Sequence, residues 1–383
     1  MSEEKEITEY SFEDLDIKDD LLRGIYSYGF EKPSNIQYKS LPIFDSGKDM
    51  IAQSQSGTGK TGAFSIGVLN NIDTGVKKTQ YIILTPTHEL AKQIYGVIGN
   101  LGEKMDISIC KVIGKTNIRD SISELQRDPQ IIVATPGRLF DMINKRHVFT
   151  DNIKTLVLDE ADEMLSIVFM DILQDIIKCM PKTSQICLFS ATMPKEIIDL
   201  TDNFMNSPEK LLINRDELTL EGIKQFYIEL NQYNWKFDVL YDIYETINIT
   251  QSIIYVNSKN ILNNLYDRLS RDKFPVSYIH GDMQSSDRER NLNDFKNGVT
   301  RIMLSTDLLS RGIDIQQLSL VINFDLPKSK ETYIHRIGRS GRYGRKGTAI
   351  NFITGEDKEH MKQIENFYNT KIDEMPQNLA DYL

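Results

Sequence analysis

The chain has 383 residues, 40% of them hydrophobic and 26% charged, and a formal net charge of −10. This length exceeds what one hydrophobic core usually organises, so we expect two globular domains. No apolar run is long enough to cross a bilayer, the N-terminus is acidic, and the three cysteines form no close pair, which argues against a membrane span, export and a disulfide framework.

The excess negative charge is concentrated at the N-terminus. Residues 1–20 contain nine acidic and two basic residues, so they supply −7 of the net −10. A nucleic-acid-binding protein usually has a basic surface, and the overall charge argues against that class. The rest of the chain is nearly neutral, however, and is compatible with a local basic groove that binds nucleic acid weakly at physiological salt.

The first motif with a clear chemical meaning is Ser-Gln-Ser-Gly-Thr-Gly-Lys-Thr at Ser54–Thr61. The apolar segment Asp49–Gln53 before it is typical of a strand, and Gly62–Leu69 after it has helical character. This order indicates a phosphate-binding loop, in which backbone amides and the helix N-terminus hold phosphate oxygens. Lys60 would add positive charge and Thr61 would bind Mg²⁺. A polar surface loop is the alternative, but the flanking elements favour a bound nucleotide.

Four further apolar runs in the first half each end in a polar cluster. They are Tyr81–Leu84 before Thr-Pro-Thr, Ile131–Ala134 before Thr-Pro-Gly-Arg, Thr155–Leu158 before Asp-Glu-Ala-Asp, and Ile186–Phe189 before Ser-Ala-Thr. Such continuous runs predict parallel strands buried on both faces, with crossover helices between them. Because ligands of these sheets bind beyond the carboxyl ends of the strands, we expect the polar clusters to share one site with the phosphate loop.

The second half repeats this pattern without a phosphate loop. Its apolar runs are Ser252–Val256, Val276–Ile279, Arg301–Leu304, Leu320–Phe324 and Ala349–Ile353. The polar, aperiodic stretch 214–222 is typical of a linker. We therefore predict an α/β protein with an acidic N-terminal segment at 1–20 and two tandem domains at 21–213 and 223–383, each a parallel sheet covered by helices on both faces.

The cluster Asp159–Asp162 follows a predicted buried strand, which would place its carboxylates beside the loop phosphates. Asp159 would hold Mg²⁺, directly or through water, and Glu160 would orient and deprotonate the attacking water. An acidic turn is the alternative for the tetrapeptide alone. The preceding strand and the phosphate loop upstream favour a catalytic site.

Three arginines, Arg336, Arg339 and Arg342, recur at a spacing of three in the second half. That spacing predicts guanidinium groups on roughly one helical face, and arginine supplied across a closing interface stabilises a phosphoryl transition state. A solvated face, or one that binds phosphate backbones, is the alternative.

Taken together, the ordered motifs resemble those of the DEAD-box family of RNA-dependent ATPases, and most closely its eukaryotic initiation factor 4A branch. The resemblance covers nearly the whole chain. It rests on Tyr28–Gln37, Ser54–Thr61, Asp159–Asp162, Ser190–Thr192, Ser305–Asp307, Arg311–Asp314, His335–Arg342 and Glu374–Asp381. The resemblance implies two RecA-like domains, with ATP and Mg²⁺ between them and RNA crossing both.

The resemblance also implies roles for single residues. Gln37 is similar to the adenine reader, Phe30 to the ring that packs on the base, and Phe12 to an upstream supporting aromatic. Ordinary core packing is the alternative for Phe30. The implied ATP-binding set is Phe30, Gln37, Ser54, Gln55, Ser56, Gly57, Thr58, Gly59, Lys60, Thr61 and Asp314. The implied catalytic set is Lys60, Asp159, Glu160, Arg339 and Arg342, with Arg336 less clearly matched.

Two more groups follow from the resemblance. Asp162, Ser190, Thr192 and His335 resemble the relay that couples hydrolysis to RNA binding, although Ser190 and Thr192 would also suit simple strand-end caps. The positions that resemble RNA contacts are Pro86, Thr87, Gly114, Thr135, Gly137, Arg138, Asn257, Gly281 and Thr306. Small residues and amides there suit phosphate and ribose contacts, which carry no sequence information.

Several residues depart from the family pattern. His88 stands where the family has arginine, which removes a permanent charge from the expected RNA path. Lys115 replaces a glycine and would return charge at the cost of close backbone approach. The other departures are Ser54, Ile167, Val168 and Ser285. Apart from the conservative Ser54, these changes concern RNA affinity and unwinding more than ATP hydrolysis.

We therefore expect an ATP-dependent RNA helicase that uses ATP and Mg²⁺ and acts on single-stranded or short duplex RNA without sequence preference. An ATP-dependent RNA clamp with little turnover is the rival from another class, and a DNA helicase is a further alternative. We expect a monomer without membrane attachment, with a helical-repeat scaffold protein as partner. The cytoplasm is the expected compartment and the nucleus the alternative.

Overall fold

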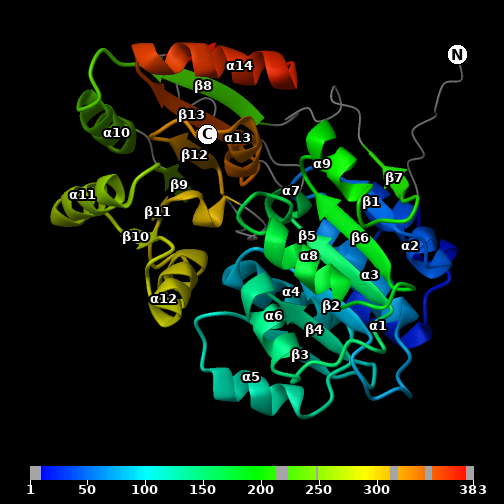
Figure 1. Cartoon of the computed structure of the whole chain (residues 1–383). Helices are drawn as coiled ribbons and strands as arrows, with labels where there is room; N and C mark the ends of the chain where they lie inside the picture. Colours follow the sequence, from blue (N-terminus) through cyan, green and yellow to red (C-terminus); the bar gives the residue numbers. More distant parts are fainter. Residues whose placement is uncertain (1–9, 213–222, 247–248, 311–317, 341–346, 377–383) are drawn as a thin grey trace, which may run out of the picture. The chain divides into compact units, whose positions relative to one another are not determined.

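The computed structural model describes residues 10–212, 223–246, 249–310, 318–340 and 347–376. The chain divides into two compact units, residues 1–213 and 214–383. The predicted linker at 214–222 lies outside the described residues. Figure 1 shows that each unit consists of a central sheet with helices on both of its faces.

The sheet of the first unit has seven parallel strands in the order β3-β4-β2-β5-β6-β1-β7. These strands are β1 Met50–Gln53, β2 Tyr81–Leu84, β3 Ile109–Val112, β4 Ile131–Ala134, β5 Thr155–Asp159, β6 Gln185–Ser190 and β7 Glu209–Leu211. Neighbouring residues of one strand serve opposite faces: Ile83 packs in one core cluster and Ile82 in the other. A strand that is apolar throughout is therefore buried on both sides.

Nine helices of the described part of the first unit surround this sheet. They are α1 Asp19–Ser27, α2 Asn35–Ser46, α3 Lys60–Asn71, α4 His88–Leu101, α5 Ile118–Leu125, α6 Pro136–Asn144, α7 Ala161–Met164, α8 Met170–Lys178 and α9 Lys195–Thr201. Helices α1 to α4 contribute to the core on one face, through residues such as Phe44 and Phe64. Helices α5 to α9 contribute to the core on the other face, through residues such as Leu139 and Leu173.

The second unit is built in the same way. Its strands are β8 Ile223–Glu229, β9 Ser252–Tyr255, β10 Val276–Ile279, β11 Ile302–Ser305, β12 Leu320–Asn323, β13 Gly347–Ile353 and β14 Asp373–Glu374. The described α-helices are α10 Trp235–Thr246, α11 Lys259–Arg271, α12 Ser285–Lys296, α13 Lys330–Ile337 and α14 Lys358–Tyr368. Helices α10 and α11 pack on one face of the sheet, and α12 to α14 pack on the other.

The two sheets have the same strand order. The second sheet runs β10-β11-β9-β12-β13-β8-β14, so each strand corresponds to the one seven places earlier in the chain. All its described pairings are parallel. Loops that follow corresponding strands therefore leave corresponding points on the carboxyl edge of each sheet.

The predicted fold class is confirmed: both units are parallel sheets covered by helices. Each apolar run predicted as a strand forms one, with ends that differ by a residue or two. The pattern did not reveal β3, β7, β8 and β14, which lie at or beside a sheet edge and include partly exposed residues. Within the described residues, no helix is both long and apolar enough to span a membrane.

Candidate functional site

The predicted phosphate loop lies between β1 and α3. Gly57 and Gly59 have φ values of 83° and 99°, a left-handed conformation that glycine adopts without steric cost. The Lys60 ammonium donates to the backbone oxygens of Ser54 (2.6 Å) and Gln55 (2.8 Å). Lys60 is thus held against its own loop, where an incoming phosphate would exchange for carbonyl oxygens.

Gln37 of α2 lies directly against this loop. Its side-chain oxygen accepts from the Ser34 amide (2.8 Å), and its side-chain nitrogen is 3.3 Å from the Gly59 oxygen. A Cβ atom at Gly62 would approach the Gln37 nitrogen to 2.5 Å and the Phe30 ring to 3.1 Å. The absence of a side chain at Gly62 therefore makes room for both residues predicted to bind adenine.

Aromatic packing secures the segment before α2. Phe12 is buried in the core of the first unit, edge-on to Tyr26 at a centroid distance of 6.3 Å. Phe30 is edge-on to Tyr28 at 5.0 Å. Phe12 is thus a core residue packed on Tyr26 of α1, whereas Phe30 is only partly buried.

The acidic cluster begins at the last residue of β5. Asp159 and Glu160 are each 3% exposed, and the Glu160 amide donates to the Asp159 carboxylate at 3.0 Å. Glu160 has φ 51° and ψ 53°, a left-handed conformation that costs energy for a residue other than glycine. The fold therefore maintains a strained backbone at the residue predicted to act as the general base.

Burial and the neighbouring Glu160 carboxylate raise the pKa of Asp159 well above its ordinary value, while Lys60 opposes this shift. A buried carboxylate in such surroundings gains from a cation that offsets its charge. Mg²⁺ prefers hard oxygen ligands, which the Asp159 carboxylate and the Thr61 hydroxyl both offer. These two residues fit the predicted metal.

Ser190, at the end of β6, connects the two motifs. Strand β6 lies between β1 and β5, and the Ser190 backbone oxygen accepts from the Ser54 amide at 3.1 Å. The hydroxyls of Ser190 and Thr192 each donate to Asp162 at 2.7 Å. A continuous chain of hydrogen bonds thus joins the phosphate loop to the acidic cluster.

The predicted RNA contacts of the first unit follow three adjacent strands, β3, β4 and β2. The Gly114 amide, after β3, donates to the Thr135 hydroxyl, after β4, at 3.2 Å. Thr87, after β2, caps helix α4 by accepting from the Leu90 amide at 3.3 Å. The Arg138 guanidinium donates to the Thr116 backbone oxygen at 3.0 Å. Arg138 therefore also holds the loop that carries Gly114.

The remaining predicted contacts show why small residues stand there. A Cβ atom at Gly137 or at Gly281 would meet no other atom within 4 Å, so the backbone borders open space. Pro86 leads into helix α4, directly before Thr87. These positions leave room for a ligand backbone to approach.

The predicted contacts of the second unit follow the three corresponding strands. Asn257 follows β9, Gly281 follows β10 and Thr306 follows β11, and these strands are adjacent in the order β10-β11-β9. The predicted RNA contacts therefore lie after corresponding strands, at the carboxyl ends of the strands in both sheets. In the first unit, in contrast, the phosphate loop follows β1, the acidic cluster begins at the end of β5, and Gln37 lies in α2.

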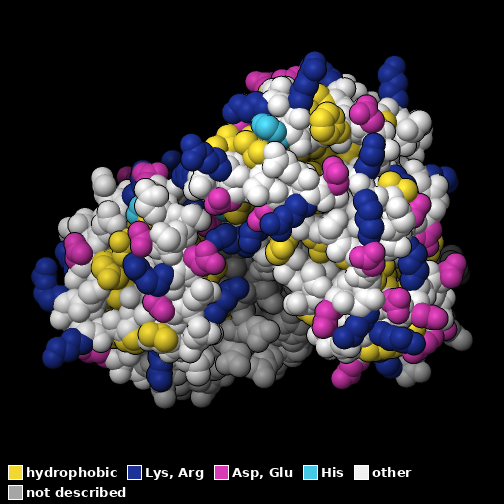
Figure 2. Space-filling model, turned by 90° about the horizontal axis from the view of Figure 1, so that it is seen from below, with side chains coloured by type: hydrophobic (Ala, Val, Ile, Leu, Met, Phe, Trp, Pro, Cys, Tyr) yellow, Lys and Arg dark blue, Asp and Glu magenta, His cyan; other side chains and the backbone are white. Residues whose placement is uncertain are grey.

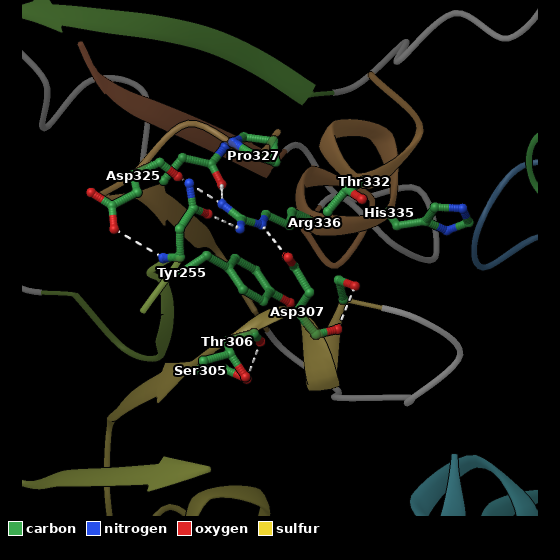
Figure 3. Close-up of polar contacts among 12 residues, drawn as sticks. Tyr255, Ser305, Thr306, Asp307, Asp325, Pro327, Thr332, His335 and Arg336 are labelled. Atoms are coloured by element: carbon green, nitrogen blue, oxygen red, sulfur yellow. Dashed lines mark hydrogen bonds and ion pairs between the residues drawn. The ribbon is translucent and has the colours of Figure 1, made fainter. Parts of the chain in front are cut away.

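Arg336 and Arg339 do not share one helical face as their spacing suggested, because α13 ends at Ile337. Arg336 is fully buried and donates to side chains of its own unit, as Figure 3 shows, with the labelled His335 pointing away from it. Arg339 lies past the helix end and donates from Nε to the His335 oxygen at 3.1 Å. Arg342 and Asp314 lie outside the described residues.

Sequence reasoning did not predict the hydrogen-bond acceptors of Arg336. They are the side chains of Asp307, Asn323 and Asn257 and the backbone oxygen of Asp325. One signal was present, because Asp325 follows a predicted strand just as Asp159 does. Sequence reasoning also missed a buried lysine. Lys236 is 2% exposed, and its ammonium nitrogen lies 3.5 Å from a carboxylate oxygen of Asp325. Its partner is distant in sequence, so spacing could not reveal the pair.

The residues that depart from the family pattern differ in conformation and exposure. The His88 ring lies where a side chain at Gly114 would be, with Nε2 3.1 Å from that Cβ position. Lys115 has φ 55°, a conformation in which glycine is unstrained. Ile167 and Val168 are 96% and 78% exposed. Ser285 begins α12, in which Arg288 is buried.

Basic and acidic side chains are interspersed on the face of the molecule that Figure 2 draws. Exposed ion pairs also form within the first unit, such as Lys145 with Asp141 and Lys178 with Asp175. Such pairs contribute little to stability and offset the positive charge available to a polyanion.

Two family models match the chain. Residues 34–200 match the DEAD/DEAH box helicase model, and residues 235–344 match the helicase conserved C-terminal domain. Among curated relatives, an ATP-dependent RNA helicase eIF4A of Pyricularia oryzae is 51% identical, with 97% of this chain and 94% of the relative covered. That of Neosartorya fischeri is 50% identical, with 99% and 95% covered.

Solved structures agree with these matches. Saccharomyces cerevisiae Dbp5 bound to RNA and ADP BeF3 is similar with a TM-score of 0.92 and 35% identity, and 97% of each chain is covered. A DEAD box protein from Methanococcus jannaschii has a TM-score of 0.55 and 36% identity, with 96% of this chain and 99% of the other covered.

Proposed function

The chain belongs to the DEAD-box family and is an ATP-dependent RNA helicase, and on this premise we propose that ATP and RNA together close its two domains. Closure would bring Arg339 and Arg342 to the γ-phosphate that the first domain holds. It would also bend one RNA strand and locally separate a short duplex. Hydrolysis would reopen the domains and release the strand, without processive translocation.

In this proposal the residues of the first domain bind most of the ATP molecule. Gln37 and Phe30 hold the adenine, and the loop amides with Lys60 hold the phosphates. Asp314 of the second domain contacts the ribose. Bound Mg²⁺, held by Thr61 and Asp159, would neutralise charge that develops on the phosphates. Glu160 accepts the proton of the attacking water, for which its buried position beside Asp159 is suited.

The observation that carries the proposal is the hydrogen-bond chain through Ser190. It joins Ser54 of the phosphate loop to Asp162 of the acidic cluster. A change in how the loop holds phosphate can thus be transmitted to the carboxylate that we propose to contact His335. Asp162, Ser190, Thr192 and His335 would then couple the hydrolysis of ATP to the binding of RNA.

RNA would be held through phosphates and riboses by Pro86, Thr87, Gly114, Thr135, Gly137, Arg138, Asn257, Gly281 and Thr306. The supporting observation is that these positions follow corresponding strands in the two domains. Backbone contacts carry no sequence information, so binding would be nonspecific, and 2′-hydroxyls would favour RNA over DNA.

The decisive experiment compares ATP hydrolysis by the wild type and by Glu160→Gln, with and without single-stranded RNA. We expect RNA to stimulate the wild type, and we expect the variant to lose at least about 100-fold in kcat while it still binds ATP and RNA. A wild type that closes on ATP and RNA but releases no phosphate would identify an RNA clamp. Stimulation by matched DNA equal to that by RNA would identify a DNA helicase.

The relatives support a proposal for the physiological setting. We propose a role in translation initiation, since the curated relatives are named eIF4A. We further propose that the protein acts as a monomer in the cytoplasm and that a helical-repeat scaffold accelerates its cycle. A S. cerevisiae Dbp5 structure was solved bound to Gle1, so a protein partner has a precedent among structural neighbours.

A further inference from the structure

Arg336 is the buried centre of a polar cluster in the second unit (Figure 3). Its Nε donates to Asp307 at 2.7 Å, Nη1 to the Asn323 side chain at 3.2 Å and to the Asp325 backbone oxygen at 2.7 Å, and Nη2 to the Asn257 side chain at 2.7 Å. The guanidinium also lies over the Tyr255 ring, 5.1 Å from its centroid. We call Arg336, Asp307, Asn257, Asn323 and Asp325 the Arg336 cluster.

The Arg336 cluster joins helix α13 to the ends of three adjacent strands. Asn257 follows β9, Asp307 follows β11, and Asn323 and Asp325 lie at the end of β12. Two of these loops contain predicted RNA contacts, because Asn257 is one and Thr306 directly precedes Asp307. A single planar group therefore fixes the separation of two loops that would hold one RNA strand.

Asp325 strengthens this arrangement from the other side. One carboxylate oxygen accepts from the Asn257 amide at 2.9 Å, and the other accepts from the Tyr233 hydroxyl at 2.8 Å. The Lys236 ammonium donates to the Phe324 oxygen at 2.7 Å and lies 3.5 Å from Asp325. The Asn257 loop is thus held at its backbone by Asp325 and at its side chain by Arg336.

The shared strand order allows Lys236 and Asp325 of the second unit to be compared with Lys60 and Asp159 of the first. Helix α10 follows β8 as α3 follows β1, so Lys236 stands near the position of Lys60. Asp325 follows β12 as Asp159 ends β5. In the second unit this lysine and aspartate bind each other and the protein backbone. The positions proposed to hold phosphate and metal in the first unit thus correspond to residues that hold the Asn257 loop in the second.

We propose that Arg336 is a positioning residue for RNA, and not one of the arginines that reach ATP. Four of its donor contacts, all made within its own unit, would have to break for it to contact a phosphate. The inference rests on the proposed function, because it assumes that Asn257 and Thr306 contact RNA. It adds a residue that acts through them and links them to the helix preceding Arg339.

Asp307→Ala tests this proposal with little risk to folding, since the Asp307 side chain is 53% exposed. We expect its affinity for a fluorescent single-stranded RNA, measured with a nonhydrolysable ATP analogue, to fall roughly tenfold. ATP affinity without RNA should stay within about twofold of the wild type. Asp373→Ala is the matched control, because Asp373 is 52% exposed and pairs with an exposed lysine.

A second variant separates positioning from direct contact with ATP. Arg336→Lys keeps the charge but cannot serve Asp307 and Asn257 together, because it lacks the planar fork. We expect it to weaken RNA binding, and we expect the double variant with Asp307→Ala to be no weaker than Arg336→Lys alone, since both break one contact. Thermal unfolding of each variant confirms that it is folded.

These experiments distinguish failure of the positioning role from failure of the proposed function. If the wild type binds RNA and Asp307→Ala binds it equally well, the positioning role is wrong. The same holds if Arg336→Lys lowers kcat at saturating RNA and leaves RNA affinity unchanged, which would indicate contact with ATP. If the wild type itself fails to bind RNA with the analogue present, the proposed function fails first.

Discussion

Asp159 shows how a functional side chain can lower the stability of the fold that holds it. It is buried beside Glu160 and Asp162, and burial raises its pKa. Without a cation, the protein must either protonate this carboxyl group or keep an ionised one in poor solvation. The same surroundings favour a divalent cation when nucleotide binds. The stability of the protein without nucleotide therefore favours a neutral Asp159, whereas cation binding requires the ionised carboxylate.

We predict that Asp159→Asn raises the free energy of unfolding of the protein without nucleotide by about 1–2 kcal/mol at neutral pH. A raised carboxyl pKa means that the folded state keeps a proton that the unfolded state releases. Wild-type stability should therefore fall as pH rises from about 4 to about 8, relative to the variant. Urea unfolding at several pH values measures this difference.

The control for this prediction is Asp45→Asn, since Asp45 is exposed at the end of α2 and accepts a hydrogen bond from the Asn71 side chain. That variant should show no such pH-dependent difference from the wild type. A wild type that instead gains stability over this pH range, relative to Asp159→Asn, would contradict the buried-carboxyl explanation. The Asp159 variant should also lose Mg²⁺-dependent hydrolysis.

Sequence alone identified the residue types of the site better than their partners. Lys60 and Asp159 stand in local motifs that are typical of their predicted chemistry, so a pattern could find them, whereas the role of Gln37 was implied only by the family resemblance. Arg336 was placed with Arg339 by spacing, but α13 ends between them and their side chains serve different neighbours. Contacts between residues far apart in sequence, such as Lys236 with Asp325, leave no local signal.

At the scale of elements, the interior strands were predictable because burial on both faces makes them apolar throughout. β2, β4 and β5 are fully buried. β3 alternates partly exposed and buried residues, and β14 has two exposed residues. Strands of this kind depend on pairing with a neighbour, which a single short segment does not reveal.

The packing of α2 on α3 gives a prediction that separates stability from nucleotide binding. A Cβ atom at Gly62 would approach the Gln37 side-chain nitrogen to 2.5 Å, so Gly62→Ala should displace Gln37 from the loop. We expect KM for ATP to rise about tenfold, because the variant loses an oriented hydrogen-bonding group. ATPase kinetics at saturating RNA measure this change.

Gly67→Ala is the matched control for this packing effect. It lies on the same helix, and its Cβ would approach the Phe44 ring to 2.5 Å, away from Gln37. Overpacking there should cost roughly 1–3 kcal/mol of stability without changing KM for ATP. If both variants changed KM for ATP equally, the effect of Gly62→Ala would come from a general loosening of the packing between α2 and α3, and not from displacement of Gln37.

At the scale of the whole molecule, charge limits how strongly RNA can bind. The net charge is −10, and exposed lysines pair with neighbouring acids in both units. Affinity for a polyanion must therefore come from a few local positions and not from a general positive field. Near Gly114, the His88 side chain provides no permanent charge at neutral pH.

We predict that His88→Arg tightens RNA binding several-fold at low salt and steepens the salt dependence of log affinity by about 0.7, as expected for one more phosphate contact to a single strand. RNA titrations at several salt concentrations test both parts. His147→Arg is the control, because His147 follows α6, away from the carboxyl ends of the strands. Equal or weaker binding by His88→Arg would refute the prediction.

The shared strand order has one more consequence. An RNA backbone repeats the same chemical unit, and the RNA contacts that we propose follow three corresponding strands in each of the two sheets, so they form two similar grips. When both grips engage one polymer, attachment of the first raises the effective concentration of the second, and avidity replaces strong single contacts. Oligonucleotides too short to reach both grips should therefore lose affinity abruptly, and not in proportion to the nucleotides removed.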